Sequence, residues 1–238
     1  YICKIMDSAL KETLIGWAEE YNDPKYFQED PIIFPAHFAR RHKAGEASLA
    51  DVEIAALMSA HLAWGRRAMI VRDCERLFDH MEWSPYEYVM SGEYRDDDTS
   101  LHRTIKWSEI AAICRRMKSI YTERDSIEGL SDMEIRCRIF GQKEDHKAPN
   151  KKISMMRRWM VRDDGKVDLG IWRNSEKGRL ILPLDVHVYA QATSLGLTSR
   201  KQKDIITALE ITDAFREIWP DDPCLGDFAL FGYGVTNK

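Results

Sequence analysis

The sequence predicts an all-α protein. Apolar residues recur at intervals of three and four through most of the chain, and Pro, Gly and capping residues interrupt these runs at helical lengths. Counting these stop signals gives about ten helices. Apolar residues make up 44% of the 238 positions and charged residues 31%. This composition is typical of a globular protein and excludes collagen-like, low-complexity and largely disordered chains.

The first half of the chain contains four apolar stripes at helical spacing. Pro24 ends the first stripe, Gly65 ends the second, and the third ends before Ser84 and Pro85. Ser108 is a candidate N-cap for the fourth, because its hydroxyl can accept a hydrogen bond from a first-turn amide. The predicted helices cover residues 10–21, 54–62, 70–81 and 110–120.

A fifth stripe predicts a helix over residues 153–160. Asp164 and Gly165 follow it as a tight-turn pair. This pair predicts a β-hairpin between residues 160–161 and 167–172.

Three more helices are predicted after Pro183, which cannot lie inside a helix. Their start signals are Asp185 as an N-cap, Thr207 with Glu210 as a capping box, and Asp222 followed by Pro223. Gly196 is suited to end the first of the three.

Net charge and cysteine usage narrow the functional classes. The chain has 35 Lys and Arg against 39 Asp and Glu, a net charge of −4, so a nucleic-acid role requires a local basic patch. The five cysteines show no CxxC and no zinc spacing, which predicts reduced thiols in a cytoplasmic protein. No membrane span, signal peptide, metal site or cofactor motif is predicted.

The densest candidate for chemistry is the string LPLDVHV, which contains Asp185 and His187. At a helix N-terminus the dipole and free amides keep the carboxylate of Asp185 ionised and fixed. The alternative is a plain helix cap, the commoner role of such an aspartate. His187 can contact a phosphate or be a packed structural residue, and no third ligand supports a metal site.

A cationic stretch covers residues 143–162, and Arg200 and Lys201 add to it later in the chain. This stretch predicts either a surface that contacts phosphates or a solvated helix face. His61 lies on an apolar helical stripe, where a packed core histidine is the simpler interpretation.

Taken in order, three strings resemble the helix-hairpin-helix (HhH-GPD) DNA glycosylase superfamily, in particular its endonuclease III-like members. They are LMSAHLAWG, the lysine-bearing NKKISMMRRWM, and LPLDVHV followed by LGLT. The chain is most similar to an uncharacterised bacterial family distantly related to these enzymes. The strings RRWMVRDDGKVDLGIW, LGLTSRKQ and DFALFGYG carry that similarity, which covers roughly residues 30–80 and 146–235.

The resemblance implies roles for individual residues. Asp185 matches the catalytic aspartate, and Lys151 matches the lysine nucleophile of bifunctional members, with Lys152 as the adjacent alternative. His61 falls where the superfamily often places a side chain that probes the opened duplex. The residues implied to contact DNA are His61, Lys152, Arg158, His187, Arg200 and Lys201.

The implied fold is two helical subdomains that flank a cleft. Residues 51–184 are expected to form a central subdomain with the basic lysine-bearing helix, and residues 1–50 and 185–238 a second one. Polar stretches at 92–100 and 141–150 are candidate linkers.

The implied activity is an N-glycosylase, with or without AP-lyase activity, acting on a flipped base in duplex DNA that carries a damaged or abasic nucleotide. Because no Gly-rich LPGVG-type turn precedes Lys151, a non-catalytic nucleic-acid binder on the same scaffold stays open. The acidic balance leaves a third class open, a helical module that binds a protein or a small ligand.

Overall fold

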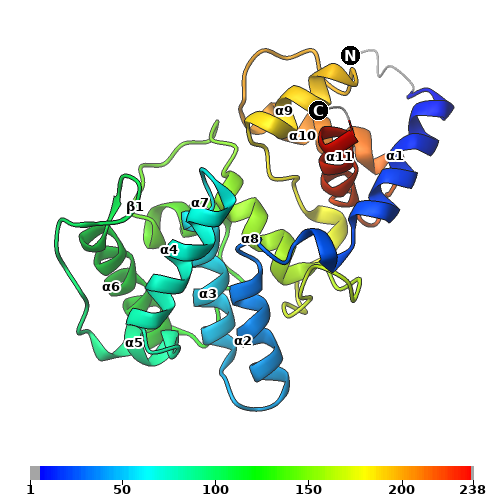
Figure 1. The fold of residues 1–238 in the computed structure, drawn as a ribbon. Coiled ribbons are helices and arrows are strands. Elements are labelled where there is room, and N and C mark those ends of the chain that lie inside the picture. The colour runs from blue at the N-terminus through cyan, green and yellow to red at the C-terminus, as the bar shows by residue number, and fades with distance from the viewer. Residues whose placement is uncertain (1–5, 237–238) are drawn as a thin grey trace. The chain divides into compact units, whose positions relative to one another are not determined.

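The computed structural model describes residues 6–236 (Figure 1). The chain divides into two compact units, a terminal unit of residues 1–26 and 146–238 and a central unit of residues 27–145. The sequence placed the boundaries at 50/51 and 184/185 instead. One of the two candidate linkers, 141–150, contains an observed boundary.

The prediction of an all-α protein is confirmed at this level. The described residues form eleven α-helices, with one small antiparallel sheet of two short strands. No described helix combines the length and the apolar character that crossing a membrane requires.

The central unit packs around α3 (Leu49–Leu62). Every residue from Ala50 onward in α3 except Asp51 is buried, so the helix has no polar face and must lie inside the unit. The other elements of the unit are α2 (Ile33–Lys43), α4 (Arg67–His80), α5 (Pro85–Ser91), β1 (Ser100–His102), β2 (Ile105–Lys106), α6 (Trp107–Glu123), α7 (Asp132–Glu134) and the π-helical turn η2 (Ile135–Ile139).

Glu53 is a fully buried carboxylate in the middle of α3. It accepts hydrogen bonds from the hydroxyls of Tyr121 (3.0 Å) and Ser126 (2.6 Å) and from the amide of Ile127 (3.1 Å). These bonds satisfy the buried charge and fix the segment after α6 against α3.

The β1–β2 hairpin was not predicted, and Ser108 is not an N-cap. Helix α6 begins one residue earlier, at Trp107, and the amide of Ser108 donates to the carbonyl of Asp97 at 2.9 Å. The loop before the helix therefore caps it with backbone carbonyls, which the sequence pattern does not reveal.

The terminal unit brings the first helix of the chain together with the last. Helix α1 (Ser8–Tyr21) packs along α11 (Leu225–Thr236), as Figure 1 shows. The remaining elements are η1 (Pro24–Tyr26), α8 (Lys151–Val161), η3 (Lys177–Arg179), α9 (Val186–Ser194) and α10 (Ile205–Arg216). Their shared core includes Leu14, Leu182, Ile211, Phe215 and Leu230, all fully buried.

Two predicted features of the terminal unit are wrong. Asp164 and Gly165 form a turn but no hairpin, because the amides of Leu169 and Trp172 donate to carbonyls of the last turn of α8 instead of to a strand. Helix α10 is capped by Asp204, whose side chain accepts from the amide of Thr207, so Thr207 lies inside the helix.

Candidate active site at two helix starts

Lys151 and Asp185 both lie where a helix of the terminal unit begins. Lys151 is the first residue of α8 and follows Asn150, which adopts a left-handed conformation (φ +47°) that asparagine tolerates better than most residues. Asp185 caps α9 as predicted, and its Oδ1 accepts from the amides of His187 (2.8 Å) and Val188 (2.9 Å).

The second oxygen of Asp185 is left for another partner. Both capping bonds use Oδ1, and within residues 6–236 no hydrogen bond reaches Oδ2. The side chain is half-buried, so the carboxylate is fixed by its own helix while one oxygen remains able to face a developing positive charge.

Arg158 lies two helical turns after Lys151, on the same face of α8. Its Nη1 donates to Asp227 in the first turn of α11, and its Nε lies 3.3 Å from Oδ1 of Asp168. Arg158 is buried and holds α8 against α11. Contact of Arg158 with DNA stays a prediction.

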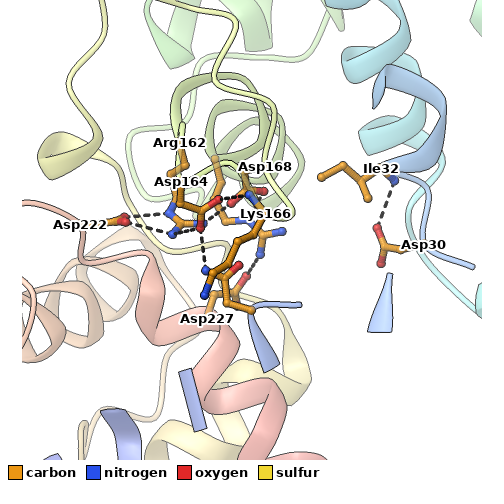
Figure 2. A network of polar contacts seen from close by, with 10 residues as sticks. Asp30, Ile32, Arg162, Asp164, Lys166, Asp168, Asp222 and Asp227 are labelled. Atoms are coloured by element: carbon orange, nitrogen blue, oxygen red, sulfur yellow. Dashed lines mark hydrogen bonds and ion pairs between the residues drawn. The ribbon is translucent and has the colours of Figure 1, made fainter. Parts of the chain in front are cut away.

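Arg162, at the end of the same helix, is the centre of a buried ion network (Figure 2). Its Nε and Nη2 donate to the two carboxylate oxygens of Asp222 at 2.8 and 2.9 Å, and Nη2 also reaches Asp164 at 2.9 Å. Nη1 donates to the fully buried carboxylate of Asp168. One guanidinium thus joins α8, the loop after it and the segment that leads into α11.

Burial and neighbouring charges shift the pKa values of several of these groups. Burial raises the pKa of Asp168 and of Asp227 above the ordinary value of an aspartate. Burial works against ionisation of Asp164 too, but Arg162 and Asn22 hold the pKa of that carboxyl below its usual range. Although burial opposes its charged form, Asp222 and the neighbouring carboxylates raise the pKa of Arg162.

Asp227 connects the two helix starts. After burial and the attraction of Arg158, the charges that act on its carboxyl include Asp185, which raises its pKa, and Lys151, which lowers it. The amine and the carboxylate that the sequence singled out therefore both lie within electrostatic reach of one buried carboxyl. Sequence reasoning missed Asp227, although it is the first residue of the string DFALFGYG.

The loop of residues 195–204, between α9 and α10, contains Arg200, Lys201 and Lys203 and lies next to α9. The hydroxyl of Tyr189 in α9 donates to the carbonyl of Arg200 (2.7 Å), and the amine of Lys203 lies 5.1 Å from the centroid of the Tyr189 ring. At the other end of this loop, the amide of Ile205 donates to the carbonyl of Lys147 (3.0 Å). The loop thus runs between α9 and the segment that leads to Lys151.

The other predicted contact residues have different environments. Lys201 and His187 are exposed and Lys152 is half-buried. Arg200 is engaged within its own loop, where Nη2 lies 2.9 Å from Asp204 and Nε donates to Thr207. It organises the loop that presents Lys201.

His61 belongs to the central unit and is only 3% exposed. Its Nε2 lies 3.0 Å from Oε1 of Glu109, and its ring stacks on Phe140. A side chain held in this way does not enter an opened duplex, so we leave His61 out of the candidate site.

Residues 140–150, before Lys151, contain no helix. These residues separate η2, which ends at Ile139, from α8, which begins at Lys151, so no tight turn joins the two elements. Among residues 6–236, no group of three or more His, Cys, Asp or Glu side chains could hold a metal ion.

Comparison with known families adds one result. The sequence matches a family described as "Protein of unknown function (DUF2400)" over residues 30–137 and 131–236. The chain belongs to this family. The two matched segments of the DUF2400 family cover most of both structural units, including Lys151, Asp185 and Asp227. No curated protein matches the chain, and no solved structure does.

Removal of the guanidinium at the centre of the network should destabilise the terminal unit. We expect R162M to lower the free energy of unfolding by about 3–5 kcal/mol, because it leaves buried carboxylates without their partner. R173Q is the matched control: Arg173 is 70% exposed and 3.8 Å from Asp163, so its loss should change stability by less than about 0.5 kcal/mol.

Urea denaturation at several pH values measures both effects. In R162M the buried carboxyls bind protons more tightly in the folded state than in the unfolded state, so the loss of stability should shrink as the pH falls from about 7 to about 5. A deficit that is the same at every pH would contradict this account of the network.

Asp227 offers a test of the site geometry that does not depend on activity. We expect D185N to lower the pKa of the Asp227 carboxyl, because it removes a neighbouring negative charge, and K151M to raise it. Carboxyl carbon NMR shifts followed against pH at low salt measure both changes. E19Q, in an exposed part of α1, is the control. Shifts no larger than those in E19Q would show that Lys151 and Asp185 do not converge on Asp227.

Proposed function

We propose that the chain is a DNA N-glycosylase with AP-lyase activity that acts on a base flipped out of the duplex. The observation that supports this proposal is the position of the two residues in one unit: Lys151 begins α8, Asp185 caps α9, and Arg158 of α8 pairs with Asp227 in the first turn of α11. The resemblance to the glycosylase superfamily assigns the nucleophile and the catalytic aspartate to these same two residues.

The chemistry follows from the two groups. The lone pair of the Lys151 amine forms a bond to the sugar C1′, and the electrons of the glycosidic bond leave with the base, which takes up a proton. The amine proton is transferred to Asp185, whose carboxylate also stabilises the oxocarbenium-like centre during the displacement. Opening of the sugar ring then gives an imine between Lys151 and C1′.

The helix starts support these roles. The backbone amides at the start of α9 hold the carboxylate of Asp185 in place, with Oδ1 accepting from His187 and Val188. The exposed side chains of Lys201 and Lys203 supply positive charge beside α9 for a polyanionic substrate.

Borohydride trapping tests the proposal directly. The purified chain is incubated with duplexes that carry an abasic site or an oxidised base, and borohydride reduces any imine to a stable covalent adduct. We expect an adduct with the wild-type protein, none with K151M, and a normal amount with K166M, a control that removes an exposed lysine of the same unit. Absence of adduct with every lesion, or an adduct that persists in K151M, would contradict the lysine mechanism.

D185N separates chemistry from helix capping. Asparagine caps a helix about as well as aspartate, so α9 should remain intact while the charge is lost. We expect base release to slow by a factor of about 10²–10⁴, the usual worth of a positioned acid–base group. Base release at the wild-type rate in a folded D185N protein would exclude this carboxylate from the mechanism.

A second candidate function is a non-catalytic nucleic-acid binder. The observation that favours it is the coil at residues 140–150, since the hairpin amides that hold a DNA phosphate in the superfamily have no counterpart there. This function predicts binding that weakens steeply with salt, with neither base release nor adduct. Binding that is insensitive to salt would exclude it.

A further inference from the structure

The tip of the β1–β2 hairpin carries an arginine in an unusual position. Arg103 has φ +54°, in the left-handed region that residues other than glycine rarely occupy. Its guanidinium carbon lies 4.2 Å from the centroid of the Trp64 ring. Gly65 (φ +110°) leaves room for this contact, because a Cβ there would lie 2.6 Å from Nη1 of Arg103.

A buried histidine fixes the positions of Trp64 and Arg103. His102, the residue before Arg103, is fully buried. Its Nδ1 lies 2.7 Å from Oδ2 of Asp73, and its Nε2 lies 2.9 Å from the carbonyl oxygen of Trp64. One ring thus ties the hairpin to the backbone that carries the indole, and the guanidinium is held on a rigid base.

The surface around this pair is cationic. Arg66, Arg72 and Arg103 are exposed. Arg72 pairs with Asp73 at 2.8 Å, and the ring of His102 contacts the same carboxylate. Within residues 6–236, the side chains of Arg66 and Arg103 have no carboxylate partner. We call Trp64, Arg66 and Arg103 the Trp64 surface.

The chemistry of the Trp64 surface suits a phosphodiester. The guanidinium of Arg103 lies over the indole, and its N–H groups form a fork that matches two phosphate oxygens. Arg66 is the N-cap residue of α4, makes no capping hydrogen bond with its side chain, and precedes a first turn without acidic residues. The helix dipole there adds to the attraction for an anion.

We infer that the Trp64 surface binds a backbone phosphate of the DNA strand, as a second contact region in the central unit. The inference rests on the proposed function for the identity of the polyanion and adds a binding site that the glycosylase chemistry does not require. Arg103 and Arg66 donate to the phosphate, and Trp64 positions the guanidinium of Arg103.

Equilibrium binding of the full chain to a fluorescein-labelled duplex with one abasic site tests the inference. Anisotropy is measured from 50 to 200 mM salt for the wild type, R66Q, R103Q and the double variant. R138Q is the matched control, because Arg138 is an exposed arginine of the same unit, 43% exposed and paired with Glu123. Thermal melting of each variant confirms that it is folded.

We expect each single variant to flatten the slope of log K against log salt by about 0.9, and the double variant by about twice that, since each phosphate contact releases counterions. R138Q should leave the slope unchanged. R103K keeps the charge but loses the planar fork, so it should keep the slope and bind about two- to fivefold more weakly.

Slopes for R66Q and R103Q that match R138Q would overturn the inference. The outcome is separate from that of the proposed function, because binding is measured without base release. A flatter salt dependence in R66Q and R103Q, without any borohydride adduct, supports phosphate binding by the Trp64 surface and contradicts the proposed lyase activity. An adduct with unchanged slopes supports the lyase and contradicts the Trp64 surface.

Discussion

The arrangement of the terminal unit depends on one buried guanidinium. Arg162 is inaccessible to solvent and holds three carboxylates, Asp164, Asp168 and Asp222. A charge removed from water in this way is tolerable only with full pairing, so the loop after α8 and the segment before α11, which supply the carboxylates, must be in place before the network is complete. Arg158, one turn earlier in α8, is also buried and forms ion pairs with Asp168 and Asp227.

This network explains why α8, which begins with Lys151, belongs to the same unit as the N-terminal and C-terminal parts of the chain. Asp222 and Asp227 come from the C-terminal part, and Asn22 at the end of α1 donates to Asp164 (2.6 Å). Helix α8 is therefore anchored at its C-terminal end. Burial raises the pKa values of Asp168 and Asp227, against the attraction of the guanidiniums beside them.

Local signals in the sequence predicted much of the fold. The stripes at 10–21 and 153–160 became α1 and α8, and Asp185 became an N-cap with the expected hydrogen bonds. These features depend on helical periodicity and on one side chain near its own backbone, which a sequence displays directly. Lys151 and Asp185 were found through the resemblance, and their common environment was a prediction that only coordinates could examine.

Features that depend on distant partners were missed. The sequence interpreted Arg158 as a phosphate contact because it lies in a cationic stretch, whereas Asp227 pairs with it from 69 positions away. The hairpin at 100–106 was missed because its strands have three and two residues, too few for an alternating pattern. Asp164 and Gly165 do make a turn, but the last carbonyls of α8 take the amides that a second strand would have used. In each case a tertiary partner decided the outcome.

The central proposal is that the Lys151 amine and the carboxyl of Asp185 act together at one site of the terminal unit, next to Asp227. Zero-length carbodiimide coupling of the native chain, followed by peptide mapping, tests this most directly. The account predicts an intramolecular amide bond between the peptide that contains Lys151 and a peptide that contains Asp185 or Asp227. Coupling of Lys151 only to other carboxyls, while the protein remains folded, would contradict it.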